Sequence, residues 1–68
     1  MKHRSGKQMA VIARELGWIL KSQQGSHQHY RDPITGKIAT IPIHGSKMLH
    51  SGTQKSIMKT LGITDADL

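Results

Sequence analysis

Two histidines in the stretch Gly25-Ser26-His27-Gln28-His29-Tyr30 are the side chains of this sequence best suited to acid–base chemistry. A histidine titrates near neutral pH, so it can accept or donate a proton under ordinary conditions. The stretch is typical of a β-strand, in which residues two apart point to the same face. His27, His29 and Arg31 should therefore share one face. On spacing alone, a polar strand residue without a catalytic role is the more ordinary interpretation of His27.

Length and composition predict a single basic domain over residues 1–68. Ten Lys and Arg against four Asp and Glu give a net charge of +6 and a pI of 10.2. A pI above about 9 is typical of small nucleic-acid-binding domains, although a basic surface can also serve solubility alone. The sequence has no cysteine, which excludes disulfides and thiolate metal sites, and no signal peptide or long apolar run. We therefore expect a cytoplasmic protein.

Two amphipathic helices are expected, one near each end of the sequence. The first should run from an N-cap at Ser5 to about Leu16, with Gly17 ending it. Its apolar stripe comprises Met9, Ile12, Ala13 and Leu16. The second should be capped by Ser51 or Thr53 and end at Gly62. Its stripe comprises Ile57, Met58 and Leu61. Residues 1–4 are expected to be a short polar start and residues 64–68 a frayed acidic tail.

Three strands are expected between the helices, at about residues 18–23, 26–32 and 37–43. Their connections are short, so the pairing should be antiparallel, because a parallel crossover needs roughly a dozen residues. Trp18 and Tyr30 are expected in the core, and Pro42 should mark an edge or the end of a strand. The order α-β-β-β-α predicts an α+β two-layer sandwich, as in double-stranded-RNA-binding domains. Both helices would cover one sheet face and leave the other for a ligand.

From its first helix to Ile63 the sequence resembles the HicA-type mRNA interferase toxins. The likeness rests on ordered short motifs, namely Gly17-Trp18, Gly25-Ser26-His27 with Tyr30, Ile41-Pro42 with His44, Gly52-Thr53, Ser56-Ile57-Met58-Lys59 and Leu61-Gly62. The resemblance implies that His27 is the catalytic residue and that the substrate is mRNA. It also implies that an antitoxin of the HicB type occludes the site.

Metal-independent RNA cleavage needs a base for the ribose 2′-hydroxyl and an acid for the departing 5′ oxygen. His27 is the expected base. The acid is His29 or His44, and His29 is favoured because it shares a strand face with His27. Contacts with single-stranded or loosely structured RNA are expected from Arg31, Lys37, Lys47 and Lys55.

Two alternatives follow from the same residues. The histidines at positions 3, 27, 29, 44 and 50 could hold a metal, but they lack the helical or Cys/His spacing of zinc sites, so neither a metal nor another cofactor is expected. The fold could instead be a non-catalytic module that grips duplex RNA through phosphate and 2′-hydroxyl contacts.

Overall fold

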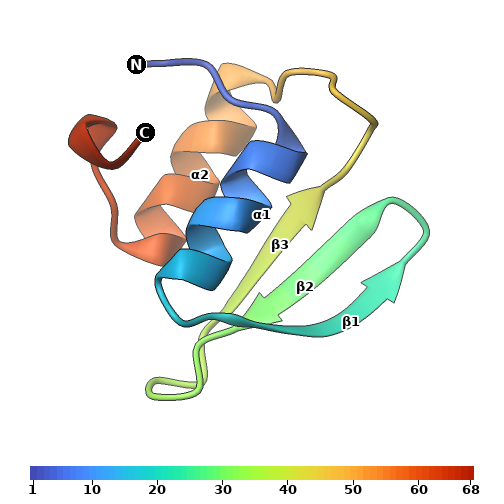
Figure 1. The fold of residues 1–68 in the computed structure, drawn as a ribbon, viewed down its shortest axis with the longest axis vertical. Coiled ribbons are helices and arrows are strands. Elements are labelled where there is room, and N and C mark those ends of the chain that lie inside the picture. Colours follow the sequence, from blue (N-terminus) through green and yellow to red (C-terminus); the bar gives the residue numbers. More distant parts are fainter.

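The computed structural model describes all 68 residues and confirms the predicted order α-β-β-β-α (Figure 1). Its elements are α1 (Gly6–Glu15), β1 (Ile19–Gln24), β2 (His27–Arg31), β3 (Ile38–Pro42) and α2 (Ser51–Leu61). The strands form one antiparallel sheet in the order β1-β2-β3, so β2 is central. Neither helix is long and apolar enough to cross a lipid bilayer.

Helix α1 begins at the predicted N-cap. The Ser5 hydroxyl accepts a hydrogen bond from the backbone N–H of Gln8 at 3.2 Å, and the Gln8 side chain accepts one from the Ser5 N–H at 2.9 Å. This reciprocal capping box satisfies two amides that the helix would leave unpaired. Gly17 ends the helix with a φ of 94°, as predicted. The expected apolar stripe was wrong at Leu16, which lies at the C-cap and is exposed, whereas Ala10 is buried instead.

Helix α2 begins one residue earlier than its predicted caps allow. Its N-cap is His50, which makes no side-chain capping bond, and Ser51 is already helical. The preceding segment is held by pairing with the start of the chain, because the Leu49 N–H donates to the Arg4 carbonyl at 3.0 Å. That pairing sets where the helix can start, so the prediction of a Ser51 or Thr53 cap was wrong. The predicted end at Gly62 is confirmed by its φ of 73°.

The tail is more ordered than the expected frayed end. Residues Asp65–Asp67 form a 3-10 helix, and the Asp67 carboxylate accepts a hydrogen bond from the Thr64 N–H at 2.8 Å. The Arg4 guanidinium donates to the Leu68 carbonyl, which ties the two ends of the chain together.

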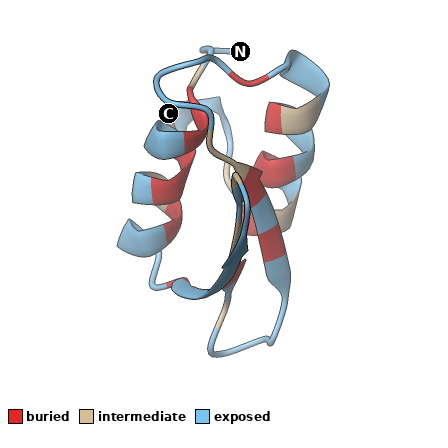
Figure 2. Ribbon diagram, turned by 90° about the vertical axis from the view of Figure 1, so that its right-hand side faces the viewer, coloured by how far each residue is buried: buried red, intermediate tan, exposed pale blue.

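Burial alternates along β3, and β2 has a single buried residue, which agrees with both helices covering one face of the sheet. Tyr30, Ala39 and Ile41 are buried, and their strand neighbours are partly or fully exposed. Figure 2 shows the buried residues on the inner sides of both helices and on the strands that they cover. Trp18 is buried, as predicted, and Pro42 is the last residue of β3. The second sheet face therefore stays open.

A buried glutamine holds the N-terminal segment against α2. The Gln54 side chain is fully buried, accepts a hydrogen bond from the Arg4 N–H at 2.8 Å and donates to the Lys2 carbonyl at 2.7 Å. These two hydrogen bonds hold the N-terminal segment in place against α2, because breaking either bond leaves a buried polar group unsatisfied. This contact brings the start of α1 close to the end of β3, where a β-carbon on Gly6 would lie 1.9 Å from the Pro42 carbonyl oxygen.

Candidate active site on the open face of the sheet

The open face of β2 carries His27, His29 and Arg31. Tyr30, between the last two, is fully buried on the helix side, so its neighbours project the other way. Two residues along a strand span about 7 Å, which leaves room for one phosphate group between the two imidazoles. The structure thus brings together the pair of histidines that the strand pattern predicts to share a face.

His29 is oriented by a neighbour on the next strand. Its Nδ1 lies 2.9 Å from the Thr40 hydroxyl oxygen, and Thr40 is its cross-strand partner on β3. With Nδ1 engaged, the other ring nitrogen is the one available to a substrate. Thr40 was not predicted as a site residue, because its contact with His29 depends on the strand register, which short-range sequence patterns do not specify.

His27 is exposed and opens β2 directly after the turn from β1. Gly25 makes that turn with a φ of 57°, a conformation that favours glycine. The Ser26 carbonyl accepts a hydrogen bond from the Ile43 N–H at 2.6 Å, which continues the β2–β3 pairing past the strand ends. The Gly-Ser-His motif therefore combines a turn residue, a paired backbone residue and an exposed imidazole.

Tyr30 anchors β2 on the face opposite the histidines. Its hydroxyl donates to the Gln28 side chain at 2.7 Å and accepts from the Arg14 guanidinium at 3.0 Å. The same guanidinium lies 5.8 Å from the centre of the Tyr30 ring. These contacts link the central strand to α1, and they confirm the expectation that Tyr30 is a core residue.

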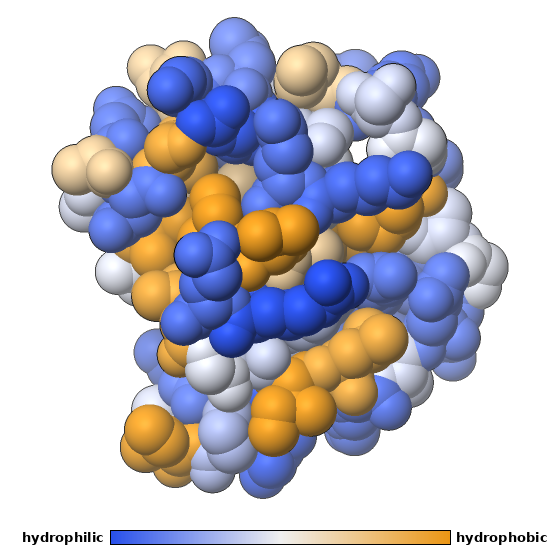
Figure 3. Space-filling view, viewed as in Figure 1, coloured by the Kyte–Doolittle hydropathy of each residue, from blue (hydrophilic) through white to orange (hydrophobic).

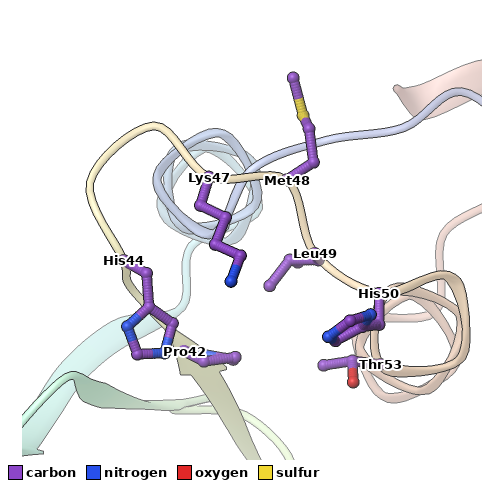
Figure 4. A pocket seen from close by; sticks show the side chains of 7 residues that line it. All are labelled: Pro42, His44, Lys47, Met48, Leu49, His50 and Thr53. Carbon is purple, nitrogen blue, oxygen red and sulfur yellow. The ribbon is translucent and has the colours of Figure 1, made fainter.

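His44, the second predicted acid, lies beyond β3 in a different setting. It lines a pocket of about 160 Å³ together with Lys47 and His50, between the end of β3 and the start of α2 (Figure 4). The structure therefore groups His29 with His27 and groups His44 with His50. The pocket was missed because its residues come from a loop and a helix start whose approach depends on the tertiary fold.

The predicted RNA-binding residues fall into separate places. Arg31 ends β2, and Lys37 follows the turn that begins at Asp32. Lys47 lines the pocket beyond the opposite end of β3, and Lys55 is exposed on α2, in the helical layer. The open face thus has basic residues at both ends, while Lys55 lies apart from it.

One carboxyl group lies near the Arg31 end of this face. Asp32 is partly buried, and its pKa is lowered chiefly because its carboxylate accepts a hydrogen bond from the Ile34 N–H at 2.9 Å. The Thr35 hydroxyl and the nearby Lys37 charge act in the same direction. The carboxylate is thus part of the turn. No group of three or more His, Cys, Asp or Glu side chains is arranged to hold a metal ion.

The side of the molecule seen in Figure 1 has a mixed surface. Hydrophobic patches are separated there by rows of hydrophilic side chains (Figure 3). The exposed hydrophobic residues of α1, its C-cap and β1 are Val11, Leu16, Ile19 and Leu20. Because these patches are interrupted, this side offers no continuous apolar surface that competes with the histidine face as a site.

Comparison with known proteins agrees with these observations. Residues 6–63 match the family described as HicA toxin of bacterial toxin-antitoxin. A protein from Pseudomonas fluorescens (strain Pf0-1), named probable mRNA interferase HicA, is 40% identical over 43 residues, which cover 63% of this chain and 72% of that protein. The matched region contains every strand and both helices.

Proposed function

Because this chain belongs to the HicA family of bacterial toxins, we propose that it is an endoribonuclease that cleaves mRNA as the toxin of a toxin–antitoxin pair. The name of the related protein, a probable mRNA interferase, supports the choice of substrate. The observation that carries the proposal is the pair of histidines on an open sheet face with basic residues at both ends.

His27 acts as the general base. It removes the proton of a ribose 2′-hydroxyl, whose oxygen attacks the adjacent phosphorus. The bond from phosphorus to the 5′ oxygen of the next nucleotide breaks, and that oxygen takes a proton from the acid. The products are a 2′,3′-cyclic phosphate and a free 5′-hydroxyl, and the chemistry uses only groups of this chain and of the RNA.

His29 acts as the general acid. Its separation of about 7 Å from His27 along the strand allows the two rings to contact opposite sides of one phosphate. The Thr40 hydroxyl oxygen can accept a hydrogen bond from the Nδ1–H of a charged His29, which would keep its second N–H for the leaving oxygen. His44 instead lies on the loop after β3, where it lines the pocket with Lys47 and His50. We therefore assign proton donation to His29 rather than to His44.

Arg31 and Lys37 stabilise the bound RNA. Arg31 lies two residues beyond His29 on the same face, within reach of the reacting phosphate or its neighbour. A fixed guanidinium near the phosphorus stabilises the extra negative charge of the transition state. Lys37, across the turn, extends the basic surface along the RNA backbone.

The test is to incubate the purified protein with an unstructured synthetic RNA and to identify the new ends. We expect fragments with cyclic phosphate and 5′-hydroxyl ends, at rates unchanged by EDTA. Activity lost in EDTA and restored by a divalent ion would contradict the metal-independent mechanism. Tight binding of duplex RNA without any cleavage would instead favour the non-catalytic module.

The inhibitor in this proposal is an antitoxin of the HicB type that covers the His27 face. Carboxylates on its surface would oppose Arg31, which should speed association. Arg31→Glu should therefore slow association with the protein encoded beside this one, most strongly at low salt. Asp65→Lys, on the 3-10 helix, is the control and should have little effect. If Asp65→Lys slowed association and Arg31→Glu did not, the antitoxin would bind a surface other than the His27 face.

A further inference from the structure

The pocket between the end of β3 and the start of α2 has the features of an anion-binding site. Figure 4 shows the Lys47 side chain directed into it, with His44 on one side and His50 on the other. The hydroxyl residue Thr53 and the apolar Leu49 complete this part of the lining. Three nitrogen-bearing side chains therefore converge on a cavity of about 160 Å³.

The positive charge of this pocket is not balanced by nearby acidic residues. Its lining contains no carboxylate, and residues 33–64 contain neither Asp nor Glu. The one ion pair of the structure joins the N-terminal amine to Asp65, so Lys47 is unpaired. The first amides of α2 add to this potential, because its N-cap, His50, gives them no side-chain hydrogen bond and its first turn has no acidic residue.

The pocket adjoins the proposed catalytic histidine. Pro42 lines it and is also the cross-strand partner of His27. Directly opposed residues on antiparallel strands have α-carbons about 4.5–5.5 Å apart and point to the same face. For an RNA strand that places one phosphate at His27, this pocket is therefore a neighbouring position for the next phosphate group.

We infer that this pocket binds the backbone phosphate of a nucleotide next to the cleaved bond, with Lys47, His44 and His50 as its ligands. The inference rests on the proposed ribonuclease function and adds a substrate subsite to it. It gives His44 a binding role in place of proton donation. It also gives a role to His50, which lies at the N-cap of α2 and lines the pocket.

The experiment measures binding apart from cleavage. The probe is a short unstructured RNA methylated at every 2′ oxygen, which cannot supply the attacking hydroxyl. Its affinity for the wild-type protein, Lys47→Gln and Lys59→Gln is measured between 50 mM and 200 mM salt. Lys59→Gln is the matched control, because it removes the same charge from an exposed site in the last turn of α2, away from the pocket.

Loss of one phosphate contact on a single strand should lower the salt slope of log K by about 0.7, which corresponds to about fivefold weaker binding near 0.1 M salt. We expect this change for Lys47→Gln. The double variant His44→Gln/His50→Gln, which removes both imidazoles from the pocket, should also bind more weakly than the wild type. Lys59→Gln should bind within twofold of the wild type. In NMR spectra of the wild type, the probe should shift the backbone amide signals of residues 44–53.

Equal losses for Lys47→Gln and Lys59→Gln would show that Lys47 contributes only general charge, and would overturn the subsite. Unshifted amide signals at residues 44–53 in a saturated complex would overturn it as well. Both results are compatible with efficient cleavage by the wild type. Failure of the wild type to cleave unmethylated RNA would contradict the proposed function itself, so the two failures are distinguishable.

Discussion

Replacing His27 with alanine should abolish most RNA cleavage while leaving the fold intact. In the proposed mechanism this imidazole is the only group that removes the proton of the 2′-hydroxyl. Removal of a general base typically costs about 10²–10⁴-fold in rate. We therefore expect the single-turnover cleavage rate of His27→Ala to fall by that factor on a synthetic RNA, with its affinity for the methylated RNA changed much less.

The stability change should be small, because the His27 side chain is exposed. The remaining cost is the lower strand propensity of alanine, and such differences span about 1 kcal/mol. For a domain of this size, 1 kcal/mol lowers Tm by about 4–8 °C. Thermal unfolding followed by circular dichroism should therefore show a cooperative transition with a Tm no more than about 8 °C below that of the wild type.

The control for this variant is His3→Ala, which removes a histidine from the exposed N-terminal segment. Its cleavage rate should stay within twofold of the wild type. A folded His27→Ala protein that cleaves RNA at the wild-type rate would refute the assignment of His27 as the base. An unfolded variant would refute the argument that this side of β2 contributes little to stability.

Three further predictions concern the parts of the fold that hold the site. Gly6→Ala should destabilise the protein by about 1–3 kcal/mol in urea unfolding, because the new β-carbon would lie 1.9 Å from the Pro42 carbonyl oxygen; an unchanged midpoint would contradict this close approach. Tyr30→Phe should cost about 0.5–1.5 kcal/mol by losing the hydroxyl bond to Gln28, and equal unfolding midpoints would argue against that bond. Asp32 has a lowered pKa, so its stabilising effect is complete above about pH 4 and is lost as the pH falls through the lowered pKa. The Tm of Asp32→Asn should thus fall less steeply than that of the wild type below pH 4, and parallel curves would refute this contribution.

The local features of the fold could be predicted because each depends on neighbouring residues. The Ser5 cap and the end of α2 at Gly62 follow from helix-terminus chemistry, and both are confirmed. The alternation along β2 predicted that His27 and His29 share a face, and the burial of Tyr30 agrees with it. These patterns repeat over two to four residues, so they can be recognised without knowledge of the tertiary structure.

The features that were missed depend on contacts between distant segments. The Thr40 partner of His29 requires the register of β2 against β3. The start of α2 at Ser51, with His50 as its N-cap, follows the pairing of the preceding segment with the N-terminal residues, which overrides the capping preference of Ser51. The buried Gln54 connects segments about fifty positions apart. A short sequence pattern does not specify any of these contacts, because each joins segments that are far apart in the chain.

The position of the histidine pair is set from the opposite side of the strand. A shift of β2 by one residue would turn His27 and His29 toward the helices and expose Tyr30. That shift is costly, because Tyr30 is fully buried and its hydroxyl is bonded to both Gln28 and Arg14. The exposed imidazoles need few contacts of their own, since the tyrosine behind them fixes which residues face the substrate. The two faces of β2 therefore have different roles, because Tyr30 packs in the core on one face and the histidines are presented to the substrate on the other.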